Sequence, residues 1–275
     1  MSKIGNIKKQ RAFLKWAGGK YNLIEAINQH LPSATTLVEP FVGAASVFLN
    51  TNFANYVLND INADLIDMYK IIQKEPADFI KFSRDWFAPE FNDKAQYIEI
   101  RQRFNQCTDP FLRAQLFLYL NRHCFNGLCR YNQSGLFNVP FGKYKRPYFP
   151  EAELWFFAEK AQRATFLCQG YQQIFANLPA QSAVYCDPPY VPLSKTASFT
   201  SYAKNSFRLD DQADLASLAE MAQQQGHVVL ISNHDTSWTR KIYQGAELHT
   251  IQVGRSISQK GSTRGKVAEL FALYK

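Results

Sequence analysis

The sequence has 275 residues, 46% of them hydrophobic, so it can bury one large core, or one core with a smaller inserted module, without cross-links. A formal net charge of +8 at pH 7 favours polyanionic partners, with nucleic acid as the leading class. Five cysteines without a C-x-x-C pair, and no apolar run of about 18 residues, argue against a disulfide framework, a zinc site, a signal peptide and a membrane span, and predict a reducing, cytoplasmic location.

The first motif along the chain is Gly18-Gly19-Lys20, which precedes a predicted helix over residues 23–27. The start of a helix offers free backbone N–H groups and Lys20 adds a positive charge, so this motif can bind a carboxylate. It is not a phosphate-binding P-loop, because the upstream glycine of that motif is missing and Tyr21 stands in place of Ser or Thr.

The next segment predicts a βαβ unit, with a strand over 36–38, a short helix ending near residue 49 and a second strand over 55–60. Such a unit implies a parallel sheet that binds ligands at the carboxyl ends of its strands. The turn Glu39-Pro40-Phe41-Val42-Gly43 lets the backbone approach a ligand closely, and Asp60 can bind ribose hydroxyls. Nothing matches G-x-G-x-x-G, so a dinucleotide is disfavoured, and the acids favour a nucleoside that carries a cation.

Residues 61 to about 122 carry apolar side chains at helical spacing and are predicted to form helices. From 125 to 150 the chain is rich in Asn, Gly, Arg, Lys, Tyr and Pro, with a turn signal at 132–135. This composition predicts a basic hairpin or loop module outside the core.

Two further strands are predicted over 183–186 and 228–232, separated by a long loop and a helix over 210–225. The end of the chain alternates like a hairpin, over 249–253 and 267–274. The basic residues near its turn are expected to face phosphates or solvent, and they are Arg255, Lys260, Arg264 and Lys266. The predicted architecture is a single α/β catalytic domain interrupted by a mostly helical insertion.

The most specific motif, Asp187-Pro188-Pro189-Tyr190, directly follows the predicted strand over 183–186. The strand end places it at the mouth of a parallel sheet, and the two prolines fix the turn without adding competing N–H groups. The Asp187 carboxylate and the Pro188 carbonyl can accept the two hydrogens of an exocyclic amino group, while Tyr190 stacks on the base. An ordinary turn capped by Asp187 is the structural alternative.

These three motifs together resemble those of the α-class amino methyltransferases, and most closely those of the Dam family of adenine-N6 DNA methyltransferases. The similarity extends through residues 118–122, 125–132, 137–142 and 231–235. The resemblance implies an α/β fold, a Rossmann-like S-adenosylmethionine-dependent methyltransferase sheet with an inserted helical and hairpin DNA-recognition domain. The implied parts are a first catalytic part that binds the cofactor (1–65), a target-recognition insertion (66–149) and a second catalytic part (150–275).

The resemblance also implies roles for individual residues. The catalytic motif around a flipped adenine comprises Asp187, Pro188 and Tyr190. The cofactor S-adenosylmethionine, which leaves as S-adenosylhomocysteine, is bound by Trp16, Lys20, Glu39, Phe41, Gly43, Asp60 and Asp187. In double-stranded DNA, GATC bases are read by Lys15, Leu128 and Arg130, the gap left by the adenine is filled or braced by Phe125 and Asn126, phosphates are contacted by Asn132 and Lys143, and Pro140 is a further DNA contact. No metal is implied, and a monomer associated with the nucleoid is expected.

Several of these residues have a second interpretation. Phe125, Tyr131 and Tyr190 are candidates to stack on a flipped base or to plug its gap, although Tyr131 is equally suited to packing within the hairpin. Arg130 can clamp a phosphate instead of reading a guanine. Cys186 lies on the strand and is expected to pack, which argues against the thiolate chemistry of cytosine-C5 methylation.

Adenine-N6 methylation of DNA is the leading function. Cytosine-N4 methylation uses the same amino-group chemistry, and the catalytic motif alone also permits an RNA substrate. The family usually has glycine where this chain has Ala45, and if that position needs a positive φ the cofactor would bind less well. A catalytically weak DNA-binding regulator is therefore a third possibility, although we expect activity to survive.

Overall fold

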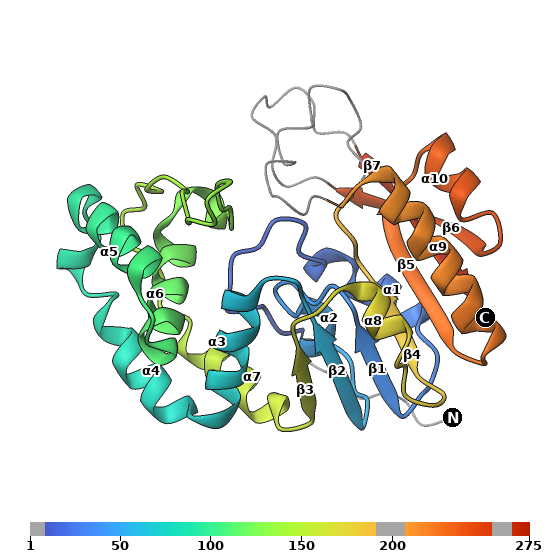
Figure 1. Ribbon diagram of the computed structural model, residues 1–275, viewed down its shortest axis with the longest axis horizontal. Helices are drawn as coiled ribbons and strands as arrows, with labels where there is room; N and C mark the ends of the chain where they lie inside the picture. The colour runs from blue at the N-terminus through green and yellow to red at the C-terminus, as the bar shows by residue number, and fades with distance from the viewer. Residues whose placement is uncertain (1–8, 191–206, 255–265) are drawn as a thin grey trace.

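The computed structural model describes residues 9–190, 207–254 and 266–275 of the chain (Figure 1). The expected basic residues Arg255, Lys260 and Arg264 lie outside the described residues. Among the described residues, no helix is both long enough and apolar enough to cross a membrane.

Seven strands of the described part form one mixed sheet in the order β3-β2-β1-β4-β5-β7-β6. They are β1 (Thr36–Glu39), β2 (Asn55–Asn59), β3 (Ala164–Leu167), β4 (Ala183–Cys186), β5 (Val228–His234), β6 (Glu247–Gly254) and β7 (Lys266–Tyr274). The five strands from β3 to β5 are parallel, and β7 is antiparallel to both β5 and β6. The predicted α/β fold, with its parallel sheet and C-terminal hairpin, is confirmed, whereas β3 was not among the predicted strands.

The central strands explain why their sequence is continuously apolar instead of alternating. All four residues of β1 and of β4 are buried. Leu37 and Tyr185 pack into the core on one face of the sheet, while Val38 and Val184 pack into the core on the other face. A parallel sheet covered by helices on both faces requires apolar side chains at every position of its inner strands.

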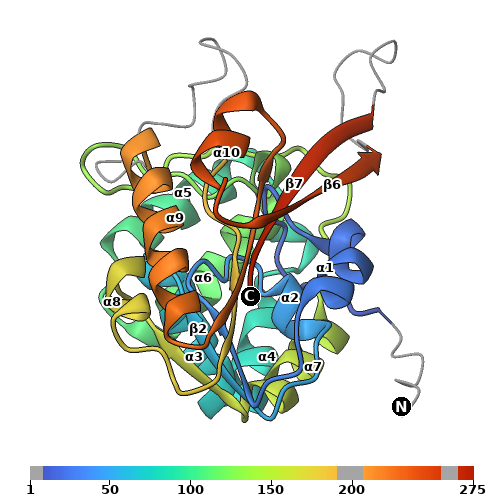
Figure 2. The ribbon, with the colours of Figure 1, turned by 90° about the vertical axis from the view of Figure 1, so that its right-hand side faces the viewer.

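Ten α-helices and three short 3₁₀ turns complete the described part. The helices are α1 (Ile24–His30), α2 (Ser46–Leu49), α3 (Ala63–Lys74), α4 (Pro76–Asp85), α5 (Lys94–Gln106), α6 (Pro110–His123), α7 (Glu151–Ala161), α8 (Tyr171–Phe175), α9 (Leu209–Gln224) and α10 (Ser237–Ile242), and the turns are η1 (Tyr21–Leu23), η2 (Pro89–Phe91) and η3 (Phe125–Gly127). One core cluster joins α8 and α9 to the sheet, and the other joins α1, α2, α3 and α7 to its opposite face (Figure 2).

Helices α4, α5 and α6 lie beyond the β3 edge of the sheet, with α3 and α7 between them and the strands (Figure 1). Helix α6 begins at Pro110, and its cap Asp109 accepts a hydrogen bond from the Leu112 N–H, the usual chemistry of a helix start. It is buried continuously from Ala114 to His123, so it is the central helix of this region.

Candidate active site

Asp187 follows β4 at the carboxyl edge of the sheet and is held by two groups. Its Oδ1 lies 2.9 Å from Lys20 Nζ and accepts a hydrogen bond of 3.1 Å from Ser232 Oγ. Burial raises the pKa of Asp187, while the Lys20 ammonium and the Ser232 hydroxyl oppose that rise because they favour the ionised form. Lys20, predicted for the cofactor, thus contacts the predicted catalytic carboxylate directly.

Tyr190 has a fixed ring position beside Asp187. Its Oη donates a hydrogen bond of 2.8 Å to Glu269 Oε2 on β7. The Lys20 ammonium lies 4.4 Å from the ring centroid, and the His234 ring meets it edge-on at 4.7 Å. Burial raises the pKa of Tyr190 well above its usual value, so the hydroxyl remains a donor. Glu269 was missed in the sequence, although a lone acid within the apolar strand Val267–Leu273 could have marked it.

Glu39, at the carboxyl end of β1, is only 2% exposed, and its Oε1 atom has no hydrogen-bond partner among the described residues. Burial raises its pKa to about 8; the nearby Asp187 adds to the rise, while a hydrogen bond from the Phe48 backbone and the charge of Lys160 oppose it. An unpaired buried polar atom is costly, so this oxygen is suited to meet a polar group of a ligand.

Asp60 and Gly43 meet at the carboxyl ends of β2 and β1. The Gly43 N–H donates to Asp60 Oδ2 at 3.1 Å, and the Asn62 N–H donates to Asp60 Oδ1 at 3.0 Å. Gly43 has a φ of +46°, and a Cβ at this position would lie 3.0 Å from Trp16 Nε1. Trp16, Gly43 and Asp60, three predicted cofactor positions, are therefore in one place, and the positive φ with the close Trp16 ring favours glycine there.

The loop after the unpredicted strand β3 also belongs to this site. Asn59 joins it to the first turn, since its side-chain amide donates to the carbonyls of Pro40 and Gln169 and its side-chain oxygen accepts the Gln169 N–H. The Asp60 N–H donates to the Leu167 carbonyl at 3.3 Å. The sequence signal was weak because β3 has four residues and lies at the edge of the sheet.

Apolar groups border the same strand ends. Ile61, directly after Asp60, is 63% exposed and offers an apolar surface beside that carboxylate. Phe41 is half-buried, and its ring lies 5.5 Å from the rings of both Tyr171 and Phe207. The acid, the exposed isoleucine and the aromatic ring suit a nucleoside with a ribose to bind and a flat base to cover.

Ala45 adopts a positive φ, the backbone conformation that favours glycine. It has φ +61° and ψ +28°, the left-handed region, and it precedes α2 with its methyl group fully buried. A non-glycine residue there costs about 1–2 kcal/mol of backbone strain, which the buried methyl group partly offsets. The positive φ of this position would therefore favour glycine over Ala45.

The predicted DNA-contacting residues lie on a hairpin that follows α6. Phe125 is 46% exposed in the turn η3, where its N–H donates to the Pro140 carbonyl at 2.8 Å. Asn126 has a φ of +54° and donates its N–H to the Tyr144 hydroxyl at 3.0 Å. Both side chains are exposed at the tip of a fixed turn, and the neighbouring Lys143 is exposed with a φ of +55°.

Lys15 joins this hairpin from the N-terminal segment. Its backbone N–H and carbonyl form hydrogen bonds of 2.9 and 2.7 Å with the side chain of Asn121. Its ammonium donates to the Arg122 carbonyl and lies 3.5 Å from the Tyr144 ring centroid. Burial and the nearby Arg122 charge lower the pKa of Lys15. Figure 1 shows the N-terminal segment, in dark blue, between the sheet and the helical region.

Arg130 is exposed, and its guanidinium bonds back to the opposite side of the hairpin. Its Nε donates to Asn138 Oδ1 at 2.8 Å, and a second nitrogen donates to the Asn138 carbonyl at 3.3 Å. Leu128, two residues earlier, is half-buried against the core. The structure thus brings Lys15, Leu128 and Arg130 to the same hairpin, with part of the guanidinium still unused.

Asn132 and Tyr131 have structural partners that the sequence did not reveal. The Asn132 side-chain oxygen accepts the N–H groups of Ser134 and Leu136, so only its amide nitrogen is left for a phosphate. The Tyr131 hydroxyl donates to Asp64 Oδ2 at 2.5 Å, and its ring packs edge-on against Phe137. Of the two interpretations of Tyr131, packing within the hairpin is the one that the structure shows.

Comparison with known proteins places these features in one family. Residues 16–257 match the D12 class N6 adenine-specific DNA methyltransferases. The chain belongs to this family. Proteins named DNA adenine methylase are similar over nearly the whole chain: one from Vibrio cholerae serotype O1 is 60% identical over 269 residues, covering 98% of this chain and 97% of the relative. Those of Salmonella typhimurium and Escherichia coli K12 are 59% and 58% identical, covering 98% of this chain and 96% and 97% of the relatives.

As a D12 class methyltransferase, the protein is an adenine-specific DNA methyltransferase, which confirms the predicted activity and does not favour the cytosine-N4 alternative. Its reaction needs a methyl donor and a DNA substrate. No group of three or more His, Cys, Asp or Glu side chains that could hold a metal occurs in residues 9–190, 207–254 and 266–275. All five cysteines are free in the described part of the chain. Cys186 is buried in the core beside β5, as expected for a packing residue.

Proposed function

We propose that the protein transfers the methyl group of S-adenosylmethionine to N6 of adenine in GATC sites of duplex DNA, taking the adenine out of the helix. The observation that carries this proposal is the end of β4, where the Asp187 carboxylate pairs with Lys20 and the Tyr190 ring lies beside the same ammonium. A carboxylate and an aromatic ring next to Lys20, a predicted cofactor position, support the proposal.

The proposed chemistry depends on Asp187 and the Pro188 carbonyl. Their oxygens accept the two hydrogens of adenine N6, which favours a pyramidal nitrogen with an available lone pair as positive charge develops on it. Ser232 and Lys20 orient the Asp187 carboxylate from one oxygen and leave the other for N6. Lys20 must give up part of its contact with Asp187 when the substrates bind, because the Lys20 ammonium and the substrates then share the same carboxylate.

Tyr190 is proposed to stack on the extruded base. Its hydrogen bond to Glu269 fixes the ring before the base arrives, so little freedom is lost on binding. The cost of removing the adenine from the helix is offset by this stacking and by the contacts to N6.

For the cofactor, we propose that Asp60 accepts hydrogen bonds from the ribose hydroxyls and that Gly43 and Trp16 line the cofactor site. Phe41 is proposed to border the adenine ring of the cofactor. Glu39, neutral below pH 8, supplies a buried polar group, and Lys20 and Asp187 lie toward the reacting end. When bound, S-adenosylmethionine supplies an electrophilic methyl group on a sulfonium and leaves as S-adenosylhomocysteine. The buried and unpaired Oε1 of Glu39 supports a polar ligand at this place.

On the DNA side, we propose that the insertion over 66–149 recognises the target while the parts 1–65 and 150–275 catalyse, in a monomer. Lys15, Leu128 and Arg130 read bases, and the exposed Phe125 and Asn126 fill or brace the gap left by the adenine. Asn132 and Lys143 are proposed to contact phosphates, and Pro140 is a further DNA contact. The exposed side chain of Phe125 and the positive charge of the chain support this assignment.

The test is to methylate a plasmid with the purified protein and to cut it with enzymes that distinguish methylated from unmethylated GATC. We expect protection at GATC alone and N6-methyladenine after digestion to nucleosides. N4-methylcytosine, preferential transfer to competing RNA, or a mobility shift without any transfer from labelled S-adenosylmethionine would each overturn the proposal. The Asp187→Ala variant is the matched control, because it should bind DNA without methylating it.

A further inference from the structure

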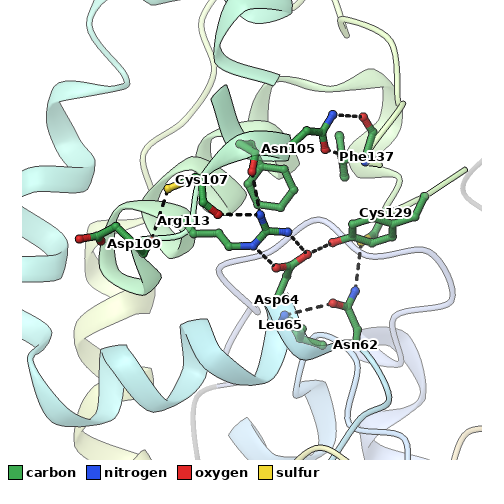
Figure 3. A network of polar contacts seen from close by, with 11 residues as sticks. Asn62, Asp64, Leu65, Asn105, Cys107, Asp109, Arg113, Cys129 and Phe137 are labelled. Carbon is green, nitrogen blue, oxygen red and sulfur yellow. Dashed lines mark hydrogen bonds and ion pairs between the residues drawn. The ribbon is translucent and has the colours of Figure 1, made fainter. Parts of the chain in front are cut away.

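The first turn of α3 carries a half-buried carboxylate, Asp64, that accepts three hydrogen bonds (Figure 3). Asp64 Oδ1 accepts from Arg113 Nε at 2.6 Å, and its Oδ2 accepts from a second Arg113 nitrogen at 3.1 Å and from the Tyr131 hydroxyl at 2.5 Å. The Asp64 side chain is only 14% exposed. Hydrogen bonds to a charged acceptor in such a setting are strong and directional, so the position of Asp64 determines the position of Tyr131.

Arg113 is itself fixed, so it cannot simply follow Asp64. One of its nitrogens donates to the carbonyls of Phe104 and Cys107 at the end of α5, and the guanidinium lies 4.2 Å from the Phe104 ring centroid. Figure 3 shows the Arg113 guanidinium between Cys107 and Asp64. The guanidinium therefore connects α3, α5 and α6 at one rigid junction.

A second residue of the same turn reaches the hairpin. Asn62 caps α3 by accepting the Leu65 N–H, and its amide nitrogen contacts Cys129 Sγ at 3.3 Å. Cys129 and Tyr131 are the two neighbours of Arg130 along the chain. In extended backbone, successive side chains point in opposite directions, so anchoring residues 129 and 131 inward directs Arg130 outward. The exposure agrees, since Arg130 is exposed and both neighbours are half-buried.

The opposite side of the hairpin is held at the same level. Asn105 on α5 accepts the Phe137 N–H at 2.8 Å and donates to the Phe137 carbonyl at 3.1 Å. Phe137 pairs with Tyr131 across the hairpin, and the next residue, Asn138, receives the Arg130 guanidinium. Both sides of the hairpin are thus anchored beside its turn, leaving Arg130 little freedom to shift relative to α3.

We infer that Asp64 is a positioning residue for sequence recognition, which acts through the Tyr131 hydroxyl to place the Arg130 guanidinium at its base. This inference rests on the proposed function, in which Arg130 reads a guanine. A bidentate contact to a base requires the guanidinium within a narrow range of distance and angle. A displacement of about 1 Å at Tyr131 would therefore weaken reading of the correct base without removing any group that touches DNA.

The test measures kcat/KM for methylation of hemimethylated duplexes that contain GATC or a site with one guanine-containing pair replaced. The specificity ratio at a base pair is kcat/KM for GATC divided by kcat/KM for the duplex in which that pair is replaced. Tyr131→Phe removes only the hydroxyl and retains the ring on Phe137, and Asp64→Asn retains the shape of the side chain. Arg130→Ala should lower the ratio at one base pair by about 10- to 100-fold. We expect Tyr131→Phe and Asp64→Asn to lower the ratio at that same pair by about 3- to 10-fold, with the KM for the methyl donor unchanged.

The double variant Arg130→Ala, Tyr131→Phe is decisive, because a residue that acts through Arg130 should have no further effect once Arg130 is gone. Tyr119→Phe is the matched control: it removes a hydroxyl that donates to the Phe91 carbonyl in the same helical region, away from the hairpin. Thermal melting confirms that each variant is folded. If Arg130→Ala changes the ratio while Tyr131→Phe and Asp64→Asn do not, or if the double variant shows additive losses, the inference is wrong and the proposed function stands. If Arg130→Ala leaves every ratio unchanged, both are wrong.

Discussion

Replacing Gly127 with alanine should separate DNA binding from cofactor binding. Gly127 ends the turn η3 with a φ of +63°, and an added Cβ would lie 2.1 Å from Lys15 Cβ and 3.1 Å from the Lys15 carbonyl oxygen. Ordinary contact begins near 3.4 Å, and neither of these Lys15 atoms is the flexible end of a side chain. The turn and the N-terminal segment would have to move apart.

The magnitude follows from two terms. A residue with a Cβ in the left-handed region costs about 1–2 kcal/mol, and overpacking of a close contact costs about 1–3 kcal/mol. The sum, about 2–5 kcal/mol, is smaller than the stability of a typical domain, so we expect the hairpin to detach locally while the sheet stays folded. If DNA binds only the attached form, its dissociation constant should rise by up to about 30-fold at the low end of this range, and by more at the high end, as the detached form becomes populated.

The assay is titration of a fluorescent GATC duplex with Gly127→Ala, alongside binding of S-adenosylhomocysteine by calorimetry. Gly226→Ala is the matched control, since Gly226 also has a positive φ, +85°, but nothing lies within 4 Å of the added Cβ. We expect DNA affinity to fall for Gly127→Ala alone and cofactor affinity to stay unchanged in both. Equal DNA affinity of the two variants would refute the argument that contact with Lys15 holds the turn.

Three further predictions concern the sheet edge. Asp187→Asn should lower single-turnover methyl transfer by about 100- to 1,000-fold with little change in DNA affinity; a loss under 10-fold would rule out the N6 contact. Asp60→Asn should raise the dissociation constant of S-adenosylhomocysteine about 10- to 100-fold, because a charged hydrogen bond is lost, whereas an unchanged value would remove Asp60 from the cofactor site. Burial raises the pKa of Glu39 from its usual 4.5 to about 8 in the folded protein. The contribution of the neutral side chain to the free energy of unfolding is therefore complete below pH 4.5 and is lost as the pH rises to 8. The melting temperature of the wild type should therefore fall relative to that of Glu39→Gln between pH 5 and 8, and parallel curves would contradict the buried neutral form.

The sequence revealed those parts of the site that are local in the chain. Asp187 to Tyr190 follows an apolar strand directly, and Gly43 and Asp60 belong to one βαβ unit, so strand ends and turn residues placed them correctly at one edge. Contacts between distant segments were not predictable. Nothing near Tyr190 in the sequence indicates Glu269, and nothing near Lys15 indicates Asn121, because both pairs are formed only by the tertiary fold.

Two other differences have local causes. Strand β3 was missed because four residues at a sheet edge show no clear periodicity. The side-chain oxygen of Asn132 also closes a turn, a role that asparagine in a turn signal often takes, while its amide nitrogen stays available for the predicted phosphate contact. Ala45 adopts its positive φ despite a side chain that disfavours it, so the fold around the turn overrides the local preference.

The segment from residue 15 to residue 20 connects three places at once: Lys15 lies against Gly127 and Tyr144 of the hairpin region, Trp16 lies against Gly43, and Lys20 pairs with Asp187. The hairpin is consequently not an interchangeable module. Grafting a relative's hairpin would require exchanging this short N-terminal stretch as well, and such an exchange would also disturb the ion pair of Asp187. Single substitutions can alter one place at a time, but replacement of the whole hairpin would reach the end of β4.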